Sequence, residues 1–316
     1  MKKHNFFERH SKKTVLILTV LIIFIFVGMS ELVLQKFMGL GNPVLYDSSP
    51  IYGYRPLPNK EYRRFGGAKI KFNNLALRTE SDWDDKRENK ILFLGDSITY
   101  GGSYIDNSEL FSSLVVKDFN GYESGNAGVN GWGVENIHGL VVESNFLPAQ
   151  IYVTTLPEGD FYRGLTRLQG LPFFNNPPRL AFEELWLFFC CSQNNKRYRP
   201  WQDFSDEKQT ILVVEKAVNK LRQMDMYLKE KGFEHLIFIT PSLNQALEKK
   251  DESTLIQKML LKHSLKFIPI KDELKKYDFS DNQIISFYND NIHLTKEGHK
   301  IWSEIIRYKL AQLINL

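Results

Sequence analysis

The sequence predicts an α/β protein with three layers, α/β/α, in which helices cover both faces of a doubly wound, five-stranded parallel sheet. Two observations support this fold class: short apolar runs typical of buried strands alternate five times with amphipathic helical stretches, and the 316 residues, 43% of them hydrophobic, are enough for one large core. An apolar segment at residues 14–34 precedes this pattern and predicts an N-terminal transmembrane helix. The net charge of +4 is too small to indicate a nucleic-acid partner.

The apolar segment follows five basic residues within positions 1–13 and contains an uncharged run, Thr14–Ser30. This pattern is typical of a membrane anchor or of a signal peptide, and Gly28-Met29-Ser30 is an acceptable cleavage site. We favour an uncleaved anchor, because the run is longer than a usual signal core and Leu32–Leu34 extend it beyond Glu31. Residues 1–13 are then expected in the cytoplasm. Either interpretation places the chain after about residue 35 outside the cytoplasm, in a bacterial periplasm, or secreted if the segment is cleaved.

Residues 35–89 are rich in turn signals that exclude a long helix, and we expect a stalk that lies over the domain and spaces it from the membrane. The alternation in Lys69–Phe72 predicts a short strand. Arg55, Arg63 and Arg64 are interpreted as ordinary exposed basic residues, with contact to an acidic polysaccharide as the alternative.

The domain begins near Lys90 with Ile91–Leu94, an apolar run that predicts a strand buried on both faces. Ser97 follows just past the carboxyl end of this strand, at the edge where open α/β sheets bind ligands. A serine hydroxyl needs a neighbouring base to become a nucleophile. Asp290 and His293, three residues apart in a loop before the last helix, offer an acid and a base. Asp96 is expected to cap the local amides and hold the turn that presents Ser97.

Gly95-Asp96-Ser97 near the start of the domain and Asp290-Asn291-Ile292-His293 near its end resemble the signature of the SGNH (GDSL-type) hydrolases. The resemblance implies the flavodoxin-like SGNH hydrolase fold for residues 90–316. It also implies a carboxylic ester hydrolase without metal or cofactor. In that family's chemistry Ser97 would attack an ester carbonyl, His293 would be the general base and Asp290 its partner.

A glycine-rich loop, Asn126–Gly133, follows the second predicted strand and leads into a helix at about 134–144. Glycines let backbone amides approach a ligand closely, and a helix start leaves amides unpaired, so the loop suits an oxyanion. The resemblance assigns the oxyanion hole to the amides of Ser97 and Gly131, with Gly128 as the fallback.

The third predicted strand, Gln150–Leu156, ends in Pro157-Glu158-Gly159-Asp160, where the chain departs from the family pattern Gly-x-Asn-Asp. Aligned on Asp160, the asparagine that donates to the oxyanion is replaced by Gly159. Loss of one such donor typically costs about 10²- to 10³-fold in rate. Three explanations follow, in order of preference: a slower enzyme using the Ser97 and Gly131 amides, a substitute donor from elsewhere, or a fold that has lost catalysis.

Residues 162–206 form an insertion broken by prolines, in which the apolar stretch Leu180–Phe189 is too short to span a bilayer. Asn195–Trp201 mixes cations with aromatic rings. We expect either a lid that binds a sugar face or an anionic group, or a peripheral helix and loop packed on the core or resting near the membrane. The adjacent Cys190 and Cys191 rarely form a disulfide and lack metal-ligand spacing, so they are interpreted as buried small residues or free thiols.

The remaining segments complete the alternation. Helices are predicted from Asn107 or Ser108 to about Lys117, over 206–231, over 253–262 and after Thr295, and strands over 235–241 and 267–270.

Together these features predict an exported, membrane-tethered ester hydrolase or acyl transferase. We expect its substrate to be an ester, with O-acetyl groups of envelope polysaccharide favoured over soluble metabolites. The alternative is a catalytically impaired module that binds polysaccharide or scaffolds an envelope assembly. The sequence leaves the oligomeric state open.

Overall fold

The computed structural model describes residues 10–168, 173–194, 207–248 and 253–314. Its central sheet has five parallel strands, in the spatial order β6 (Glu123–Asn126), β5 (Lys90–Gly95), β7 (Ile151–Pro157), β8 (Glu234–Thr240) and β9 (Ile268–Pro269). Numbered along the chain this order is 2-1-3-4-5, the flavodoxin-like doubly wound arrangement. The predicted parallel sheet is therefore confirmed, and the order places the switch point at β5, the strand that leads to Ser97.

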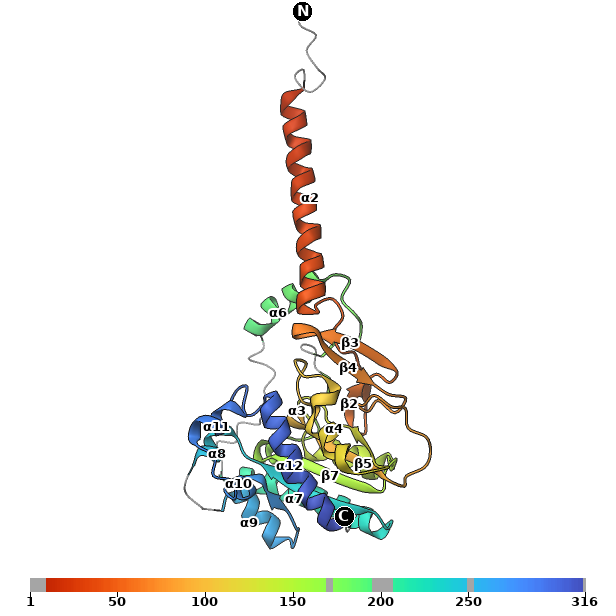
Figure 1. Cartoon of the computed structure of the whole chain (residues 1–316), viewed down its shortest axis with the longest axis vertical. Helices are drawn as coiled ribbons and strands as arrows, with labels where there is room; N and C mark the ends of the chain where they lie inside the picture. The colour runs from red at the N-terminus through yellow and green to blue at the C-terminus, as the bar shows by residue number, and fades with distance from the viewer. Residues whose placement is uncertain (1–9, 169–172, 195–206, 249–252, 315–316) are drawn as a thin grey trace, which may run out of the picture.

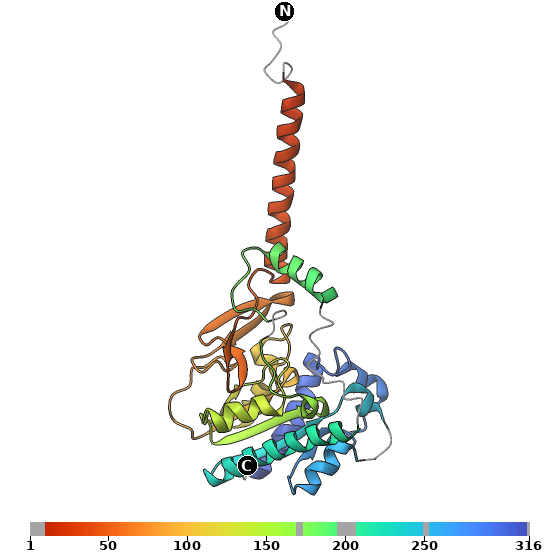
Figure 2. The same ribbon diagram turned by 180° about the vertical axis from the view of Figure 1, so that it is seen from behind.

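Two hydrophobic clusters lie on opposite faces of the sheet, because successive side chains of a strand point to opposite sides. Leu92 and Leu94 of β5 belong to the cluster that holds α5 (Val134–His138), α7 (Glu207–Glu230) and α9 (Leu255–Lys262). Ile91 and Phe93 belong to the cluster that holds α4 (Phe111–Val115), α10 (Ile270–Leu274) and α12 (Lys296–Leu313). Figures 1 and 2 show α12 and α7 on these opposite faces. The predicted three layers are confirmed.

The last helix, α12, follows the sequence prediction closely. The Thr295 hydroxyl accepts a hydrogen bond from the Gly298 amide at 3.2 Å, the expected N-cap. Trp302, Ile306 and Leu310 are buried against the sheet. The helix thus fixes the position of the loop before it, which carries Asp290 and His293.

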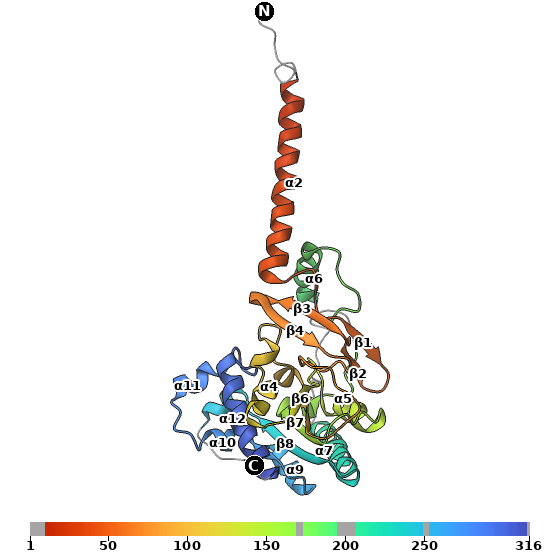
Figure 3. The ribbon, with the colours of Figure 1, turned by 45° about the vertical axis from the view of Figure 1, so that its right-hand side comes forward.

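Two β-hairpins occupy residues 46–72 of the predicted stalk: β1 (Tyr46–Ser49) with β2 (Gly53–Pro56), and β3 (Lys60–Arg64) with β4 (Ala68–Phe72). The strand expected at Lys69–Phe72 lies within β4. Tyr54, Ile70 and Phe72 are almost fully buried in the same cluster as Leu92 and Leu94. These hairpins therefore contribute to the core beside the site (Figure 3).

Helix α2 (Ser11–Met38) projects from the domain with no buried side chain (Figure 1). Among the described residues it is the one helix long and apolar enough to cross a membrane. It ends at Gly39, whose φ of 63° is left-handed. A Cβ at Gly39 would clash with the Arg63 carbonyl oxygen, and Arg64 donates a hydrogen bond to the Gly39 carbonyl. The end of α2 is thus packed directly on β3.

The segment after β5 differs from the helix predicted over 107–117. A 3-10 turn at Asn107–Glu109 is capped by Asp106 instead of Asn107 or Ser108, and α4 covers only Phe111–Val115 before another 3-10 turn. Leu110 is extended, with φ −70° and ψ 143°, which interrupts the helix. The predicted helix at 134–144 likewise changes from α5 to a π-helical turn at Gly139–Glu143.

The insertion contains a helix, α6 (Ala181–Asn194), in agreement with the peripheral helix that was one of the two expectations for this segment. Cys190 on this helix is an exposed free thiol, not a buried residue. The mixed cationic and aromatic stretch Asn195–Trp201 lies outside the described residues. The remaining short helices are α3 (Ser97–Tyr100), α8 (Leu243–Leu247) and α11 (Asp281–Ser286).

Candidate active site

Ser97 is presented by a tight strand-to-helix turn at the carboxyl end of β5. A Cβ at Gly95 would clash with the Thr99 hydroxyl and the Thr155 carbonyl, so the chain can pass this point only with glycine. The Asp96 carboxylate accepts a hydrogen bond from the Ile98 amide at 2.9 Å and caps α3, as the sequence predicts. Asp96 and Ile98 are buried whereas Ser97 is partly exposed. The turn therefore leaves the hydroxyl accessible at the sheet edge.

Asp290 and His293 lie in the loop before α12 and face Ser97. The Asp290 carboxylate accepts hydrogen bonds from the Ile292 and His293 amides, both at 2.8 Å, which folds the loop back on itself. The loop is further held by a hydrogen bond from the Leu243 amide to the Asn291 carbonyl at 2.8 Å. An acid three residues before a histidine can thus reach one side of its ring.

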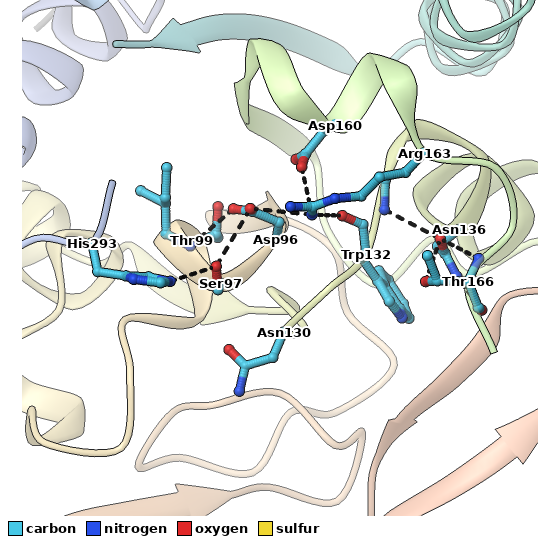
Figure 4. Close-up of polar contacts among 12 residues, drawn as sticks. Asp96, Ser97, Thr99, Asn130, Trp132, Asn136, Asp160, Arg163, Thr166 and His293 are labelled. Carbon is cyan, nitrogen blue, oxygen red and sulfur yellow. Dashed lines mark hydrogen bonds and ion pairs between the residues drawn. The ribbon is translucent and has the colours of Figure 1, made fainter. Parts of the chain in front are cut away.

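The three side chains form a continuous hydrogen-bonded chain. Asp290 Oδ2 lies 2.6 Å from His293 Nδ1, and His293 Nε2 lies 2.9 Å from Ser97 Oγ (Figure 4 shows the latter contact). The carboxylate can only accept, so Nδ1 carries the proton and Nε2 is free to accept one from the Ser97 hydroxyl. This is the tautomer that a general base requires.

The charge of Asp290 is favoured at this position. Partial burial by itself raises the pKa of the carboxyl, but the hydrogen bonds from the His293 amide, the His293 ring and the Ile292 amide outweigh it, and the pKa of Asp290 lies below its ordinary value. Asp290 is therefore ionised at neutral pH and can stabilise a positive charge on the imidazole.

The glycine-rich loop after β6 lies next to the turn that presents Ser97. The Val129 amide donates to the Gly95 carbonyl at 3.2 Å, and Tyr54 Oη donates to the Asn130 carbonyl at 2.7 Å. Gly131 has a left-handed φ of 77°, a conformation that favours glycine. Among the described residues none accepts a hydrogen bond from the Gly131 or the Ser97 N–H. Both groups remain available to an anion.

Gly128, the fallback donor, has a different local role. Its amide donates to the Asn126 side chain at 2.8 Å and is thus already used within the loop. A Cβ at Gly128 would clash with the Tyr100 amide, so this glycine permits close packing of the loop on α3. Of the two glycines, Gly131 has the available amide.

Asp160 lies in a buried ionic cluster with Asp96 and Arg163, next to the turn that carries Ser97. Arg163 Nη1 lies 2.7 Å from Asp160 Oδ1 and 3.5 Å from Asp96 Oδ2, and it donates to the Trp132 carbonyl at 2.7 Å (Figure 4). Burial raises the pKa of Asp160 well above its ordinary value, and the neighbouring Asp96 charge adds to this. The cluster joins the segments that follow β5, β6 and β7.

Arg163 was not identified from the sequence. The available signal was its position three residues after Asp160, at the end of the 3-10 helix Glu158–Tyr162 that follows β7. An acid and a base at this spacing after a buried strand are suited to a local ion pair. The contacts of Arg163 with the Trp132 carbonyl and with Asp96 depend on tertiary structure and leave no local pattern in the sequence.

A pocket of about 630 Å³ opens beside the loop that carries Asp290 and His293. Its lining includes Gly159 and Arg163 from the segment after β7, Ile292 and His293 from the loop, and Gln245 of α8. Gly159 and His293 thus line the same pocket, to which Gly159 adds no side chain. Within the described part of the chain, no group of three or more His, Cys, Asp or Glu side chains is placed to hold a metal ion.

No family model matches the chain, and no curated protein matches it. Similar solved structures include a putative lipolytic protein of the G-D-S-L family from Desulfitobacterium hafniense DCB-2, with 9% identity, a TM-score of 0.39, and 70% of this chain and 99% of that chain covered. An acetyl xylan esterase matches with 14% identity and a TM-score of 0.41 over 70% of this chain and 99% of that chain. A GDSL-like lipase from Bacteroides thetaiotaomicron VPI-5482 matches with 14% identity and a TM-score of 0.39 over 72% and 89%.

Proposed function

We propose that the chain is a serine ester hydrolase or acyl transferase, held at a membrane by α2, with Ser97, His293 and Asp290 as its catalytic triad. The single observation that carries the proposal is the hydrogen-bonded chain from Asp290 Oδ2 through the imidazole to Ser97 Oγ, with contacts of 2.6 and 2.9 Å. Ser97 meets Asp290 and His293, which lie almost two hundred positions further along the chain, in the orientation that acyl transfer needs.

In the proposed reaction, Ser97 Oγ attacks the ester carbonyl carbon while its proton passes to His293 Nε2. The negative charge on the carbonyl oxygen is stabilised by the Ser97 and Gly131 amides. The tetrahedral intermediate collapses, the alkoxy group leaves as an alcohol with the proton from His293, and the acyl group remains on Ser97. Asp290 stabilises the imidazolium in both steps. Water then completes hydrolysis, or a sugar hydroxyl completes transfer, with His293 again removing the proton.

The membrane anchor is supported by α2, which carries no charged residue between Lys13 and Glu31 and buries none of its side chains. Its 28 residues give a length of about 42 Å, enough to cross the hydrocarbon core of about 30 Å. The preceding lysines favour a cytoplasmic N-terminus. In that orientation the site lies outside the cytoplasm, and O-acyl groups of envelope polysaccharide are the substrates we propose. Cleavage as a signal peptide would instead leave a mature chain without α2, which intact-mass measurement of the membrane fraction distinguishes.

A second candidate, a catalytically impaired module that binds acylated polysaccharide, is favoured by one observation: Gly159 supplies no side-chain donor beside the imidazole. One experiment separates the enzyme from the impaired module. The full chain is treated with a fluorophosphonate probe and assayed with p-nitrophenyl acetate, next to Ser97→Ala. Labelling and turnover that disappear in the variant support the enzyme. Equal signals in both proteins would remove the proposed chemistry and leave binding.

A further inference from the structure

Helix α6 carries an apolar outer surface at the place where α2 meets the domain. Among its described side chains and the preceding Leu180, three large apolar residues are strongly exposed: Leu180 at 52%, Trp186 at 69% and Phe189 at 68%. Two charged residues are exposed beside them, Arg179 and Glu183, and the Glu183 carboxylate accepts a hydrogen bond from the Arg179 amide at 2.6 Å. Exposed tryptophan and phenylalanine on one helix are typical of an interaction surface.

The opposite side of α6 is fixed to the domain by buried contacts. Glu184 is fully buried and pairs with Arg64 of β3 at 2.6 Å, and it also accepts a hydrogen bond from the Gly41 amide at 2.6 Å. Phe188 packs on Phe174, with ring centroids 6.3 Å apart. Arg64 is buried in this contact, so the prediction of an exposed basic residue is wrong for it, and the polysaccharide contact considered as the alternative is excluded as well. The outer surface of α6 therefore has a fixed position relative to the domain.

The first turn of α6 is attached to α2 itself. The Glu31 carboxylate accepts hydrogen bonds from the Ala181 amide at 2.6 Å and the Phe182 amide at 3.1 Å, and so caps the N-terminus of α6. Figures 1 and 2 show α6 at the domain end of α2, running outward across the axis of α2. On α2, Met29 and Leu32 beside Glu31 are 62% and 64% exposed, so the apolar surface of α2 is continuous with this junction.

The depth of the junction follows from helix geometry. If Lys13 lies at the inner boundary of the hydrocarbon core, Glu31 is about 27 Å further along α2, within a few ångströms of the outer boundary of a core of about 30 Å. A helix that starts there and crosses the axis of α2 lies in the outer interfacial region. Tryptophan and phenylalanine side chains are favoured at that depth.

We infer that α6 is an interfacial helix that lays Trp186 and Leu180 into the outer leaflet of the bilayer crossed by α2. The inference rests on the proposed membrane anchor. Through the Arg64–Glu184 pair, contact of α6 with lipid sets the tilt of the domain on the membrane. Because α2 already holds the domain at the bilayer, α6 needs no basic residues to attract it to anionic lipid.

The test uses the full chain in vesicles of phosphatidylethanolamine and phosphatidylglycerol, in a background with Cys190→Ser and Cys191→Ser. An environment-sensitive fluorophore is attached to one introduced cysteine at a time: Trp186→Cys on α6, Phe24→Cys within α2, and Tyr308→Cys on α12. Tyr308 is 58% exposed and belongs to α12, whose C-terminal end lies at the far end of the domain from α2 in Figure 1, so it serves as the aqueous reference. Far-UV circular dichroism and the thermal midpoint confirm that each variant is folded like its parent.

We expect the fluorophore at position 186 to emit at a shorter wavelength than the fluorophore at position 308. We also expect brominated lipid to quench the emission at position 186, as it quenches the emission at position 24. Emission at 186 that matches 308, with 24 still quenched, would overturn the inference while leaving the anchor in place. A blue shift at 186 without quenching would also overturn it, because a protein surface such as a second copy would then cover α6. Loss of quenching at position 24 would reject the anchor itself, and the inference with it.

Discussion

Replacement of Gly159 by asparagine is expected to accelerate ester hydrolysis, because it returns a side-chain donor to the end of β7. Gly159 lies inside the 3-10 helix Glu158–Tyr162, a conformation that asparagine can adopt, and it borders the pocket that contains His293. An amide at this position would add to the Ser97 and Gly131 N–H groups in stabilising the oxyanion.

The size of the effect follows from two opposing contributions. One oxyanion donor is typically worth about 2.7 to 4 kcal/mol in the transition state. Holding one asparagine side chain in a single rotamer costs about 1 kcal/mol. The difference, about 1.7 to 3 kcal/mol, corresponds to a rise in kcat of roughly 20- to 150-fold. The gain should fall on kcat and leave KM little changed, since the charge develops only in the transition state.

The assay is steady-state hydrolysis of p-nitrophenyl acetate by the full chain, with Gly159→Leu as the matched control. Leucine has nearly the shape of asparagine but offers no donor, so it reports the effect of filling the pocket alone. A Gly159→Asn rate no higher than that of Gly159→Leu would refute the reasoning, because the oxyanion would then form away from this end of β7.

Three further outcomes are expected. Asp290→Asn should lower kcat by about 10⁴-fold through loss of the required tautomer, measured under saturating ester, and a drop of less than tenfold would contradict its role. Arg163→Met should lower the free energy of unfolding, measured by urea denaturation, by about 3 to 5 kcal/mol, because it leaves buried carboxyls without their cation. A loss below about 1 kcal/mol would show that the ionic cluster contributes little to stability. Stability contributed by Asp160, whose folded pKa is raised, is fully present below its unfolded pKa of about 3.9 and is lost as pH rises toward the folded value. Asp160→Asn should therefore flatten this decline in the thermal midpoint, and an unchanged pH profile would assign the decline to other groups.

The sheet and the places of Ser97, Asp290 and His293 in it could be predicted because their signals are local. Each buried strand is a short apolar run with a clear end, and Thr295 and Asp96 are capping residues whose partners lie two or three positions away. Once the strand order is flavodoxin-like, residues that follow adjacent strands meet at one edge. This is why the sequence predicts that Ser97 and the loop of Gly131 lie at the same edge of the sheet, where the Val129 amide contacts the Gly95 carbonyl.

The parts that were missed depend on distant partners. Arg78 is completely buried, yet its guanidinium is satisfied by the carbonyls of Tyr100, Gly102 and Ile105 and by the Asn107 side chain. Such a residue looks like an exposed cation in the sequence. Its side chain holds the loop after α3, and Asn107 is bonded to Arg78 and to the β4 backbone instead of starting a helix. Local periodicity contains no trace of these contacts.

The close fit of Gly39 against β3 has a consequence for how the chain, acting as proposed, would meet its substrates. Because α2 is packed directly on the domain, a membrane-anchored α2 would leave no flexible tether, and the domain would move laterally with the membrane. Encounter would then be a search in two dimensions at a constant height above the lipid. Molecules held in that layer would be met far more often than those diffusing freely beyond it.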